Sequence, residues 1–344
     1  MAEAHGLPPV QVIQGSLQGF RMRARIAIRG RRGAPKLGLF EAGSHRVVTI
    51  PNCSVQHSLI NHVAAVVRRA LVDASVPPYS DQARQGVARY LQVVVERSSQ
   101  RAQVVLVGHC EHADPLKDAL DLIAERLGDD LHSLWFNANT SHGNAILGPQ
   151  SLKWHGADTV VETFGGAQIH YPPGAFGQSN LEIAERIVEH LRAELLPSSR
   201  VAEFYAGVGA IGLSLLPSMQ SLVLNEVSSA SLDGLARGIE GLSHAERQRV
   251  SVVEGPAGSA LSALHDVDAV IVDPPRKGLD APLRDALAAK PPRQLLYVSC
   301  SPHSLQQDIA ALTQPGGLRL AGLTAFNLMP FTEHVETVAR LERA

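Results

Sequence analysis

The stretch RVAEFYAGVGAIGL, residues 200–213, decides the fold class of this chain. An apolar run stops here at a turn that contains Gly207 and Gly209, and a helical pattern begins after it. Three further short apolar runs follow, at SLVLNE (221–226), VDAVIVD (267–273) and QLLYVSC (294–300). Strands that alternate with helical segments predict an α/β fold with an open, parallel, doubly wound sheet. Because ligands bind beyond the carboxyl ends of such strands, the residues at which these runs stop form the candidate site.

The residues before this sheet predict a smaller α+β module. FRMRARIAIR (20–29) alternates as a strand does, with apolar residues expected toward a core and arginines on the other side. Helical spacing predicts helices over 57–72 and 115–127, and residues 89–108 predict two strands joined by a polar turn. A strongly amphipathic helix is expected over 181–196, just before the doubly wound sheet.

Length and composition limit the class of protein. The 344 residues are about twice a typical domain, so we expect an α+β module over 1–165 and a second domain over 166–344. The chain is 45% hydrophobic and 19% charged, as in a soluble globular protein. No apolar run reaches the roughly 18 residues of a membrane helix. The first residues lack the pattern of a secretory signal, so we expect a cytoplasmic protein without membrane contact. Three cysteines are too few for a disulfide framework or a four-thiolate metal site, and no metal is expected.

The net charge of −2 conceals an asymmetry between the two halves. Residues 1–165 carry 17 basic and 14 acidic side chains, whereas residues 166–344 carry 14 and 19. The segment Arg21–Lys36 alone holds seven basic residues and no acid. Such a patch can meet the phosphate groups of a nucleic acid, or it can be an ordinary solvated sheet face.

The first two apolar runs end in residues that suit an adenosine ligand. Gly207 and Gly209 allow the backbone to turn sharply and to approach a ligand, although such a turn can also be purely structural. Neither the third glycine of a dinucleotide motif nor the GK[ST] of a phosphate loop follows. Glu226 ends the second run, 21 residues after Tyr205, where an acid can accept both hydroxyls of a ribose. These features predict an adenosine cofactor without a pyrophosphate, with an ordinary exposed acid as the alternative for Glu226.

The other two apolar runs end in residues that can react or position a reactant. VDPPRKG (272–278) places Asp273 at the start of a loop that two prolines make rigid. YVSCSP (297–302) places Cys300 at the edge of the same predicted sheet. A cysteine after an apolar run is more often buried and inert, but the serines and Pro302 beside Cys300 favour an exposed loop, so a nucleophile and an inert thiol are equally compatible with it. An Asp-Pro-Pro turn can also be a purely structural turn. On the residues alone, these alternatives stay open.

The order of these motifs resembles that of the class I, S-adenosylmethionine-dependent RNA (uracil-5)-methyltransferases. The motifs that carry the resemblance are FGQSN (176–180), EFYAGVGAIGL (203–213), NE (225–226), VDPPRKG (272–278), YVSCSP (297–302) and MPFTEHVETV (329–338). The front of the chain is similar to the front module of the family's bacterial 23S rRNA and tRNA enzymes, through GFRMRARIAIRG (19–30) and FNANTSHGNAILG (136–148). The resemblance implies a Rossmann-like methyltransferase domain over 166–344, preceded by an α+β module over 1–165 that binds RNA.

The resemblance also implies a catalytic pair. Cys300 would add to carbon 6 of a uracil, which turns carbon 5 into a nucleophile that takes the methyl group. Glu336, in the HVE segment, would then remove the proton from carbon 5 so that the thiolate can leave. Arg276 is a weaker candidate, for positioning the uracil or its phosphate.

S-adenosylmethionine is the cofactor that the resemblance implies. Its binding residues would be Gln178 for the methionine part, Tyr205 with the Gly207 and Gly209 turn, Glu226 for the ribose, and Asp273 at the junction of cofactor and base. Pro256 stands where the family commonly has a polar cofactor contact, so adenine recognition departs from the pattern. The cysteine cluster that holds an iron–sulfur centre in some members is missing from the sequence, and no such cluster is expected.

One alternative to an enzyme is a non-catalytic RNA-binding protein that keeps the methyltransferase fold. Its signature would be the loss of Cys300 or Glu336, and both are present. We expect 23S rRNA ahead of tRNA as the substrate, because the front motifs resemble the rRNA members more. A monomer is the default expectation for the oligomeric state.

Overall fold

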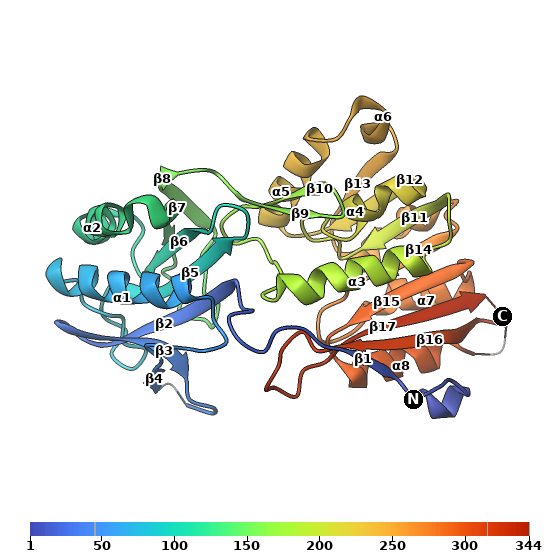
Figure 1. The fold of residues 1–344 in the computed structure, drawn as a ribbon, viewed down its shortest axis with the longest axis horizontal. Helices are drawn as coiled ribbons and strands as arrows, with labels where there is room; N and C mark the ends of the chain where they lie inside the picture. The colour runs from blue at the N-terminus through green and yellow to red at the C-terminus, as the bar shows by residue number, and fades with distance from the viewer. Residues whose placement is uncertain (45, 315, 344) are drawn as a thin grey trace. The chain divides into compact units, whose positions relative to one another are not determined.

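The computed structural model describes residues 1–44, 46–314 and 316–343. The chain divides into two compact units (Figure 1). Unit 1 comprises Met1–Ser16, Thr163–Tyr171 and Ala175–Ala344, and unit 2 comprises Leu17–Glu162 and Pro172–Gly174. Residues from both ends of the chain therefore belong to unit 1.

An eight-stranded sheet forms the centre of unit 1, in the order β1-β16-β17-β15-β14-β11-β12-β13. Its strands are β1 (Gln11–Ile13), β11 (Ser199–Phe204), β12 (Met219–Glu226), β13 (Val250–Glu254), β14 (Ala269–Val272), β15 (Gln294–Ser299), β16 (Leu318–Phe326) and β17 (Glu336–Arg343). Neighbouring strands from β13 to β15 pair in parallel, whereas β17 is antiparallel to β15 and to β16. The chain order reverses at β11, which lies between β12 and β14. The carboxyl end of β11 is therefore the switch point at which doubly wound sheets bind ligands.

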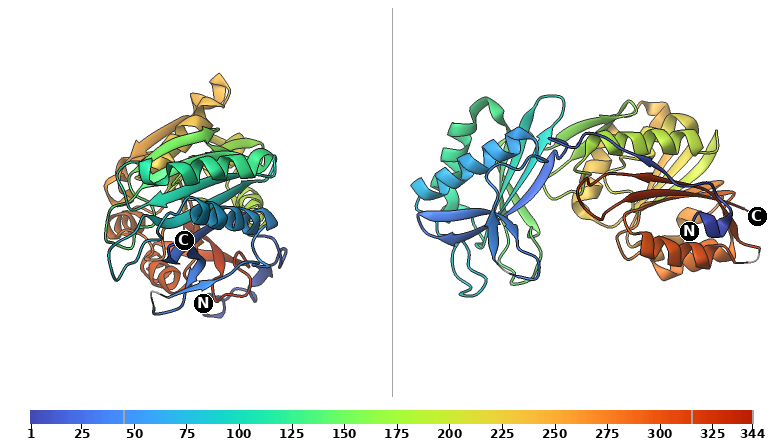
Figure 2. Two further views of the ribbon diagram at one scale, coloured as in Figure 1. Left: turned by 90° about the vertical axis from the view of Figure 1, so that its left-hand side faces the viewer. Right: turned by 60° about the horizontal axis from the view of Figure 1, so that its bottom comes forward.

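Helices cover both faces of the unit 1 sheet (Figure 2). They are α3 (Leu181–Glu194), α4 (Gly212–Leu215), α5 (Ser229–Glu240), α6 (His244–Arg247), α7 (Ala281–Ala289) and α8 (Pro302–Leu312). α3 lies along one face, and α7 and α8 pack against each other on the opposite face. Leu283 of α7 and Ile309 of α8 bury their side chains in one core with Phe204 and Val272 of the sheet. Beside this sheet, β9 (Val160–Phe164) and β10 (Ala167–Tyr171) form a two-stranded sheet.

Local sequence explains where the two helices nearest the site begin. Asn180, the last residue of FGQSN, caps α3: its Oδ1 accepts the Ile183 N–H at 3.2 Å. Its amide also donates to the Leu328 carbonyl at 3.2 Å. Ser301 caps α8, and Pro302 occupies the first helical position, where a missing N–H costs nothing. Part of the FGQSN and YVSCSP motifs therefore serves the fold itself.

Unit 2 is built on a seven-stranded sheet in the order β4-β3-β2-β5-β6-β7-β8. Its strands are β2 (Arg23–Arg31), β3 (Ala34–Phe40), β4 (Val47–Thr49), β5 (Ala88–Glu96), β6 (Arg101–Gly108), β7 (Leu131–Ala138) and β8 (Gln150–Gly156). The helices α1 (Ser58–Asp73) and α2 (Lys117–Leu127) pack against each other on this sheet. Ile26 and Leu37 lie on the face that α1 covers, beside Ala64 and Ala65 of that helix. Since side chains alternate along a strand, Arg25 and Ala27 lie on the opposite face.

The structure confirms the coarse sequence predictions. The helices expected over 57–72, 115–127 and 181–196 are α1, α2 and α3, and the two strands expected over 89–108 are β5 and β6. The parallel sheet is also confirmed, with β1, β16 and β17 added at one side.

The predicted arginine face of residues 20–29 differs from the structure most clearly at Arg29. Arg25 is exposed, but Arg29 is only 7% exposed. Its guanidinium donates to both carboxyl oxygens of Asp81, at 2.8 and 3.2 Å, and lies 5.1 and 5.0 Å from the ring centroids of Phe40 and Tyr90. The prediction that Arg29 belongs to an exposed basic face is therefore wrong, because this side chain is paired and stacked inside unit 2.

Candidate active site

Cys300 and Glu336 come together at the carboxyl edge of the unit 1 sheet. β15 ends at Ser299, which pairs with Thr337 of the antiparallel strand β17. Cys300 directly follows Ser299, and Glu336 directly precedes Thr337. Residues that flank an antiparallel pair in this way lie opposite each other. The pairing register therefore places the thiol beside the carboxyl group.

Asp273 and Arg276 belong to the same region. They lie on the loop after β14, the strand next to β15. After burial and the charge of Glu336, the charge of Asp273 also raises the pKa of the Cys300 thiol, and Arg276 lowers it. Arg276 Nη2 lies 3.1 Å from His334 Nε2, which links this loop to the segment before β17. The ends of β14, β15 and β17 thus bring one thiol, two carboxyl groups and one guanidinium group to the same edge of the sheet.

Burial sets the protonation states of these groups. Glu336 is 4% exposed, and burial raises its pKa, with a further contribution from the like charge of Asp273. Burial likewise raises the pKa of Asp273. The Cys300 thiol has a raised pKa, first from burial and then from the charges of Glu336 and Asp273. The site therefore favours neutral groups, and a cation bound beside them would shift all three toward their charged forms.

The turn around Cys300 is held by serine side chains. Ser299 Oγ donates to the Ser301 carbonyl at 3.1 Å and accepts the Ser301 N–H at 3.2 Å. Ser301 Oγ accepts the Ser304 N–H at 3.4 Å and so caps α8. Cys300 therefore precedes a helix N-terminus, whose dipole favours a thiolate over a thiol.

A pocket at the ends of β11, β14 and β15 gathers most of the predicted cofactor residues. Gln178, Tyr205, Gly207 and Asp273 line it, together with apolar side chains of α3 and of the turn after β11. The Tyr205 hydroxyl accepts the Asp280 N–H at 3.0 Å, and burial raises the pKa of Tyr205 to about 12. This ring is thereby fixed between the loops that follow β11 and β14.

The two glycines of the turn have different reasons to be glycine. Their φ angles are +58° at Gly207 and +81° at Gly209, a region that other residues adopt only with strain. At Gly209, a Cβ would also lie 2.6 Å from Leu235 Cδ1. Gly207 lines the pocket, whereas Gly209 does not, and Gly209 serves the packing of the turn against α5.

Glu226 holds the glycine turn in shape, a role that the sequence analysis missed. Its carboxylate accepts the N–H groups of Gly207 at 2.7 Å, Val227 at 2.8 Å and Ser228 at 2.7 Å. It does not line the pocket. A carboxylate has about four lone-pair positions, so one remains for a further donor.

Glu203 is a carboxyl group in the pocket wall that the sequence analysis also missed. It lies on β11, is 1% exposed and lines the same pocket as Gln178. Its oxygens lie against the Gly212 backbone, yet neither makes a hydrogen bond of ordinary geometry with the residues that the structure describes. Burial raises the pKa of Glu203 to about 8, and the charge of Asp273 adds to this. An acid inside an apolar run, as in RVAEFYA, is the signal that could have found it, because a buried carboxyl group needs a partner.

Comparison with known proteins identifies the family. The chain is 34% identical over 336 residues to an uncharacterized RNA methyltransferase of Protochlamydia amoebophila, a match that covers 96% of this chain and 88% of that protein. An uncharacterized RNA methyltransferase of Gloeobacter violaceus is 30% identical, with 98% of this chain and 74% of that protein covered. The model of the tRNA (uracil-5-)-methyltransferase family matches residues 257–344, a range that holds Asp273, Cys300 and Glu336.

The chain belongs to the RNA (uracil-5)-methyltransferases. The fold of this methyltransferase agrees with that assignment. The crystal structure of the Pyrococcus abyssi tRNA (uracil-54, C5)-methyltransferase in complex with S-adenosyl-L-homocysteine aligns with a TM-score of 0.82 at 21% identity, covering 99% of this chain and 80% of that one. The predicted Rossmann-like fold and the enzyme class are thereby confirmed. Across the described residues, no helix is both long and apolar enough to cross a membrane.

Proposed function

We propose that this methyltransferase transfers a methyl group to carbon 5 of a uridine in structured RNA, with Cys300 as the nucleophile and Glu336 as the base. The observation that carries the proposal is the register of β15 and β17, which places these two residues opposite each other one step beyond the Ser299–Thr337 pair. A thiol and a buried carboxyl group side by side are the minimum that this reaction requires.

The chemistry assigns one task to each residue. The Cys300 thiol first loses its proton to solvent, and the thiolate sulfur then forms a bond to carbon 6 of uracil. The electron pair displaced from the ring double bond makes carbon 5 nucleophilic. S-adenosylmethionine, when bound, supplies the methyl group for carbon 5 and carries the positive charge of a sulfonium. Glu336, as a carboxylate, removes the proton of carbon 5, and the electrons of that C–H bond restore the double bond as the sulfur leaves.

The residues of the pocket fit this cofactor. The carboxyl groups of buried Glu203 and half-buried Asp273 line it and have raised pKa values, so a bound cation would relieve their unfavourable environment. We assign cofactor binding to Gln178, Tyr205, Gly207, Gly209, Glu226 and Asp273. Of these, Gly209 and Glu226 act by shaping the turn, and the remaining lone pair of Glu226 is available to a ribose hydroxyl.

The RNA substrate has two candidates. The matching family model and the Pyrococcus enzyme are both named for tRNA, which supports tRNA. The 23S rRNA that we expect from the front motifs is the second candidate, and one experiment can include both.

The test is a covalent trap. The full chain is incubated with S-adenosylmethionine and 5-fluorouridine-containing tRNA or 23S rRNA fragments, and a denaturing gel separates the products. Fluorine on carbon 5 cannot leave as a proton does, so the enzyme should remain attached to the RNA that it recognises. Cys300→Ala should give no adduct, while Cys110→Ala, which removes a half-buried thiol of unit 2, should give the same amount as the wild type. RNA binding without an adduct for either RNA would overturn the proposal in favour of a non-catalytic RNA-binding protein.

A further inference from the structure

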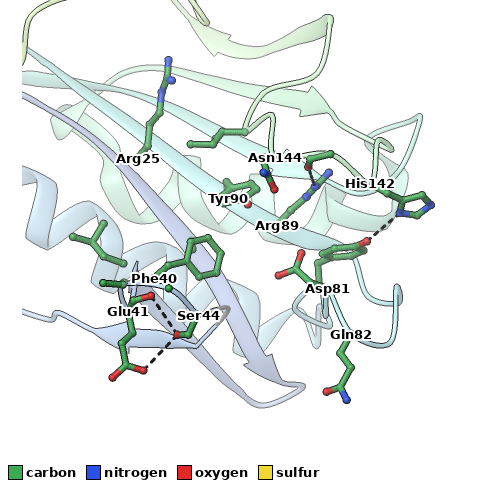
Figure 3. Close-up of a pocket in the computed structure, with 18 of the residues that line it drawn as sticks. Arg25, Phe40, Glu41, Ser44, Asp81, Gln82, Arg89, Tyr90, His142 and Asn144 are labelled. Carbon is green, nitrogen blue, oxygen red and sulfur yellow. Dashed lines mark hydrogen bonds between the residues drawn. The ribbon is translucent and has the colours of Figure 1, made fainter. Parts of the chain in front are cut away.

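Unit 2 contains a large hollow that the methyl-transfer chemistry does not use. It has a volume of about 1100 Å³ (Figure 3). Residues of β2, β3 and β5 line it, and so do the segments 40–44, 79–84 and 142–146. Pockets for small molecules enclose roughly 300–1000 Å³, so this hollow has room for a nucleotide with a flanking phosphate.

The charged groups of the hollow that have no partner of opposite charge among the described residues are positive. Its two acids are paired with arginines, Asp81 with Arg29 at 2.8 Å and Glu41 with Arg46 at 2.8 Å. Arg25 and Arg84 also line the hollow and are exposed. Neither has an acidic partner within residues 1–44, 46–314 and 316–343.

Arg25 makes one hydrogen bond to a neutral group, from its Nε to Gln92 Oε1 at 2.9 Å. Exposed guanidinium groups without a counter-charge are the side chains that bind phosphate oxygens, often through two parallel hydrogen bonds. The hollow therefore favours a ligand that carries phosphate groups.

An aromatic surface lies next to these arginines. Phe40 is 38% exposed, and its ring centroid is 6.5 Å from that of Tyr90, in an edge-on arrangement. The Arg29 guanidinium lies over both rings and is itself fixed by Asp81, so the two rings are held in place. A rigid, exposed ring beside arginine is the arrangement on which unpaired nucleic-acid bases stack.

A fixed loop completes the hollow. Arg89 is 2% exposed, and its terminal N–H groups donate to the carbonyls of Asn139, Ser141 and Gly143, at 3.1, 2.6 and 2.9 Å. These bonds hold the part of FNANTSHGNAILG (136–148) that carries Asn144, which lines the hollow (Figure 3). The Asn144 side chain makes no hydrogen bond with the residues described. Its amide can therefore donate to and accept from the edge of a base.

We propose that the unit 2 hollow binds one unstacked nucleotide of an unpaired RNA segment, with its base on Phe40 and its flanking phosphates at Arg25 and Arg84. The proposal rests on the proposed function, because it takes the bound polymer to be the RNA substrate. A base in a stem is paired and stacked and cannot reach Phe40, so the hollow distinguishes unpaired from paired RNA.

The experiment measures binding of the full chain to a short, fluorescent, single-stranded RNA without uridine, at several salt concentrations. Phe40→Leu keeps an apolar side chain but removes the ring, and it should weaken binding about five- to tenfold with an unchanged salt dependence. The double variant Arg25→Gln/Arg84→Gln should weaken binding about tenfold and reduce the salt slope by about 1.4, or about 0.7 for each phosphate contact. Arg69→Gln, which changes an exposed arginine of α1 outside the hollow, should stay within about twofold of the wild type.

Further probes separate the possible outcomes. Phe40→Trp should restore or improve binding, which a variant that merely disturbs folding would not do. Inorganic polyphosphate has no bases, so Phe40→Leu should leave its binding unchanged. The proposal would be overturned if Phe40→Leu weakened the binding of RNA and of polyphosphate equally, if a duplex bound as tightly as the single strand, or if both hollow variants lost no more affinity than Arg69→Gln.

The readout does not depend on methyl transfer, because the RNA has no uridine. Binding that depends on Phe40, in a protein that methylates neither tRNA nor 23S rRNA, would support the hollow and overturn the proposed function. If the wild type methylates RNA while Phe40→Leu and the double variant bind RNA as tightly as the wild type, the proposed function would be supported and the nucleotide site in the hollow would be overturned.

Discussion

In unit 1, three carboxyl groups gather around the site, Glu203, Asp273 and Glu336, and burial raises the pKa of each. In unit 2, the hollow instead offers the guanidinium groups of Arg25 and Arg84 and the ring of Phe40. Glu203 and Glu336 are buried and Asp273 is half-buried, whereas Arg25 and Arg84 of unit 2 are exposed. The same contrast is present in the sequence, since residues 1–165 have a positive balance and residues 166–344 a negative one.

The architecture of each unit explains the difference. A parallel sheet with helices on both faces buries its residues, and its strand ends bring distant side chains to one enclosed edge. A largely antiparallel sheet leaves a broad face for exposed side chains. Buried acids suit a small cation and proton transfer, and exposed arginines with an aromatic ring suit a polyanion. Four substitutions, at Glu336, Arg29, Glu203 and Asn180, test this difference between the two units.

The largest effect is expected at Glu336. In Glu336→Gln, the amide cannot accept the proton of carbon 5, so turnover should fall by about 10²–10⁴. The adduct through Cys300 should accumulate even on ordinary uridine-containing RNA, which a denaturing gel would show. Glu333→Gln, a change at an exposed acid of the same segment, should keep wild-type turnover. Loss of turnover without an adduct would assign Glu336 an earlier step than proton removal.

The next effect concerns the stability of unit 2. Arg29→Met leaves Asp81 without its buried partner, which should lower the free energy of unfolding by about 3 kcal/mol. Both tryptophans, Trp135 and Trp154, belong to unit 2, so tryptophan fluorescence during urea unfolding reports this unit. Arg46→Met removes an exposed pair with Glu41 and should leave the midpoint unchanged. Equal midpoints for both variants would show that Arg29 is not needed to hold the hollow.

The third change tests the buried acids of unit 1 through pH. Burial raises the pKa of Glu203 to about 8 in the folded protein. At pH values between the pKa of this group in the unfolded chain and about 8, Glu203 is protonated in the folded protein and ionised in the unfolded chain. Its contribution to stability is therefore full below the unfolded pKa and is lost progressively as the pH rises from there to about 8. Glu203→Gln should unfold with a smaller pH dependence, as circular dichroism on heating would measure. A parallel pH dependence in variant and wild type would mean that Glu203 is charged in the folded protein.

The smallest effect is expected at the cap of α3. Asn180→Ala removes the hydrogen bond to the Ile183 N–H and should cost about 1 kcal/mol of stability. Because Asn180 is also tied to Leu328, this variant reports on unit 1 and should leave the tryptophan-detected unfolding of unit 2 unchanged. Ser179→Ala, at the neighbouring position, serves as the control and should match the wild type. A shifted unit 2 transition would contradict the separation that the comparison assumes.

Much of the fold follows from local patterns. The amphipathic spacing in 181–196 and the apolar runs around 200–226 predict α3, β11 and β12, because periodic burial leaves a direct trace in the order of residues. The positions of Gly207, Asp273 and Cys300 at strand ends follow from the same reasoning. Arg29 and Glu203 do not follow, because a charged residue in a strand does not reveal whether a partner or a pocket receives it. Their surroundings come from segments that are distant in the sequence.

By itself, the sequence determined the α/β class, the order of the motifs and the residue types able to perform the chemistry, because these depend on local periodicity and composition. Only the tertiary structure decided which residues meet. The register of β17 brings Glu336 to Cys300, and Glu226 accepts the N–H of Gly207 from the turn after β11 in addition to the two N–H groups that follow β12. On one face of β2, Arg25 is exposed, whereas Arg29 is buried and paired with Asp81. The physical reason is that strand pairing and burial join residues far apart in the chain, and the pattern around any one of them does not record its partner.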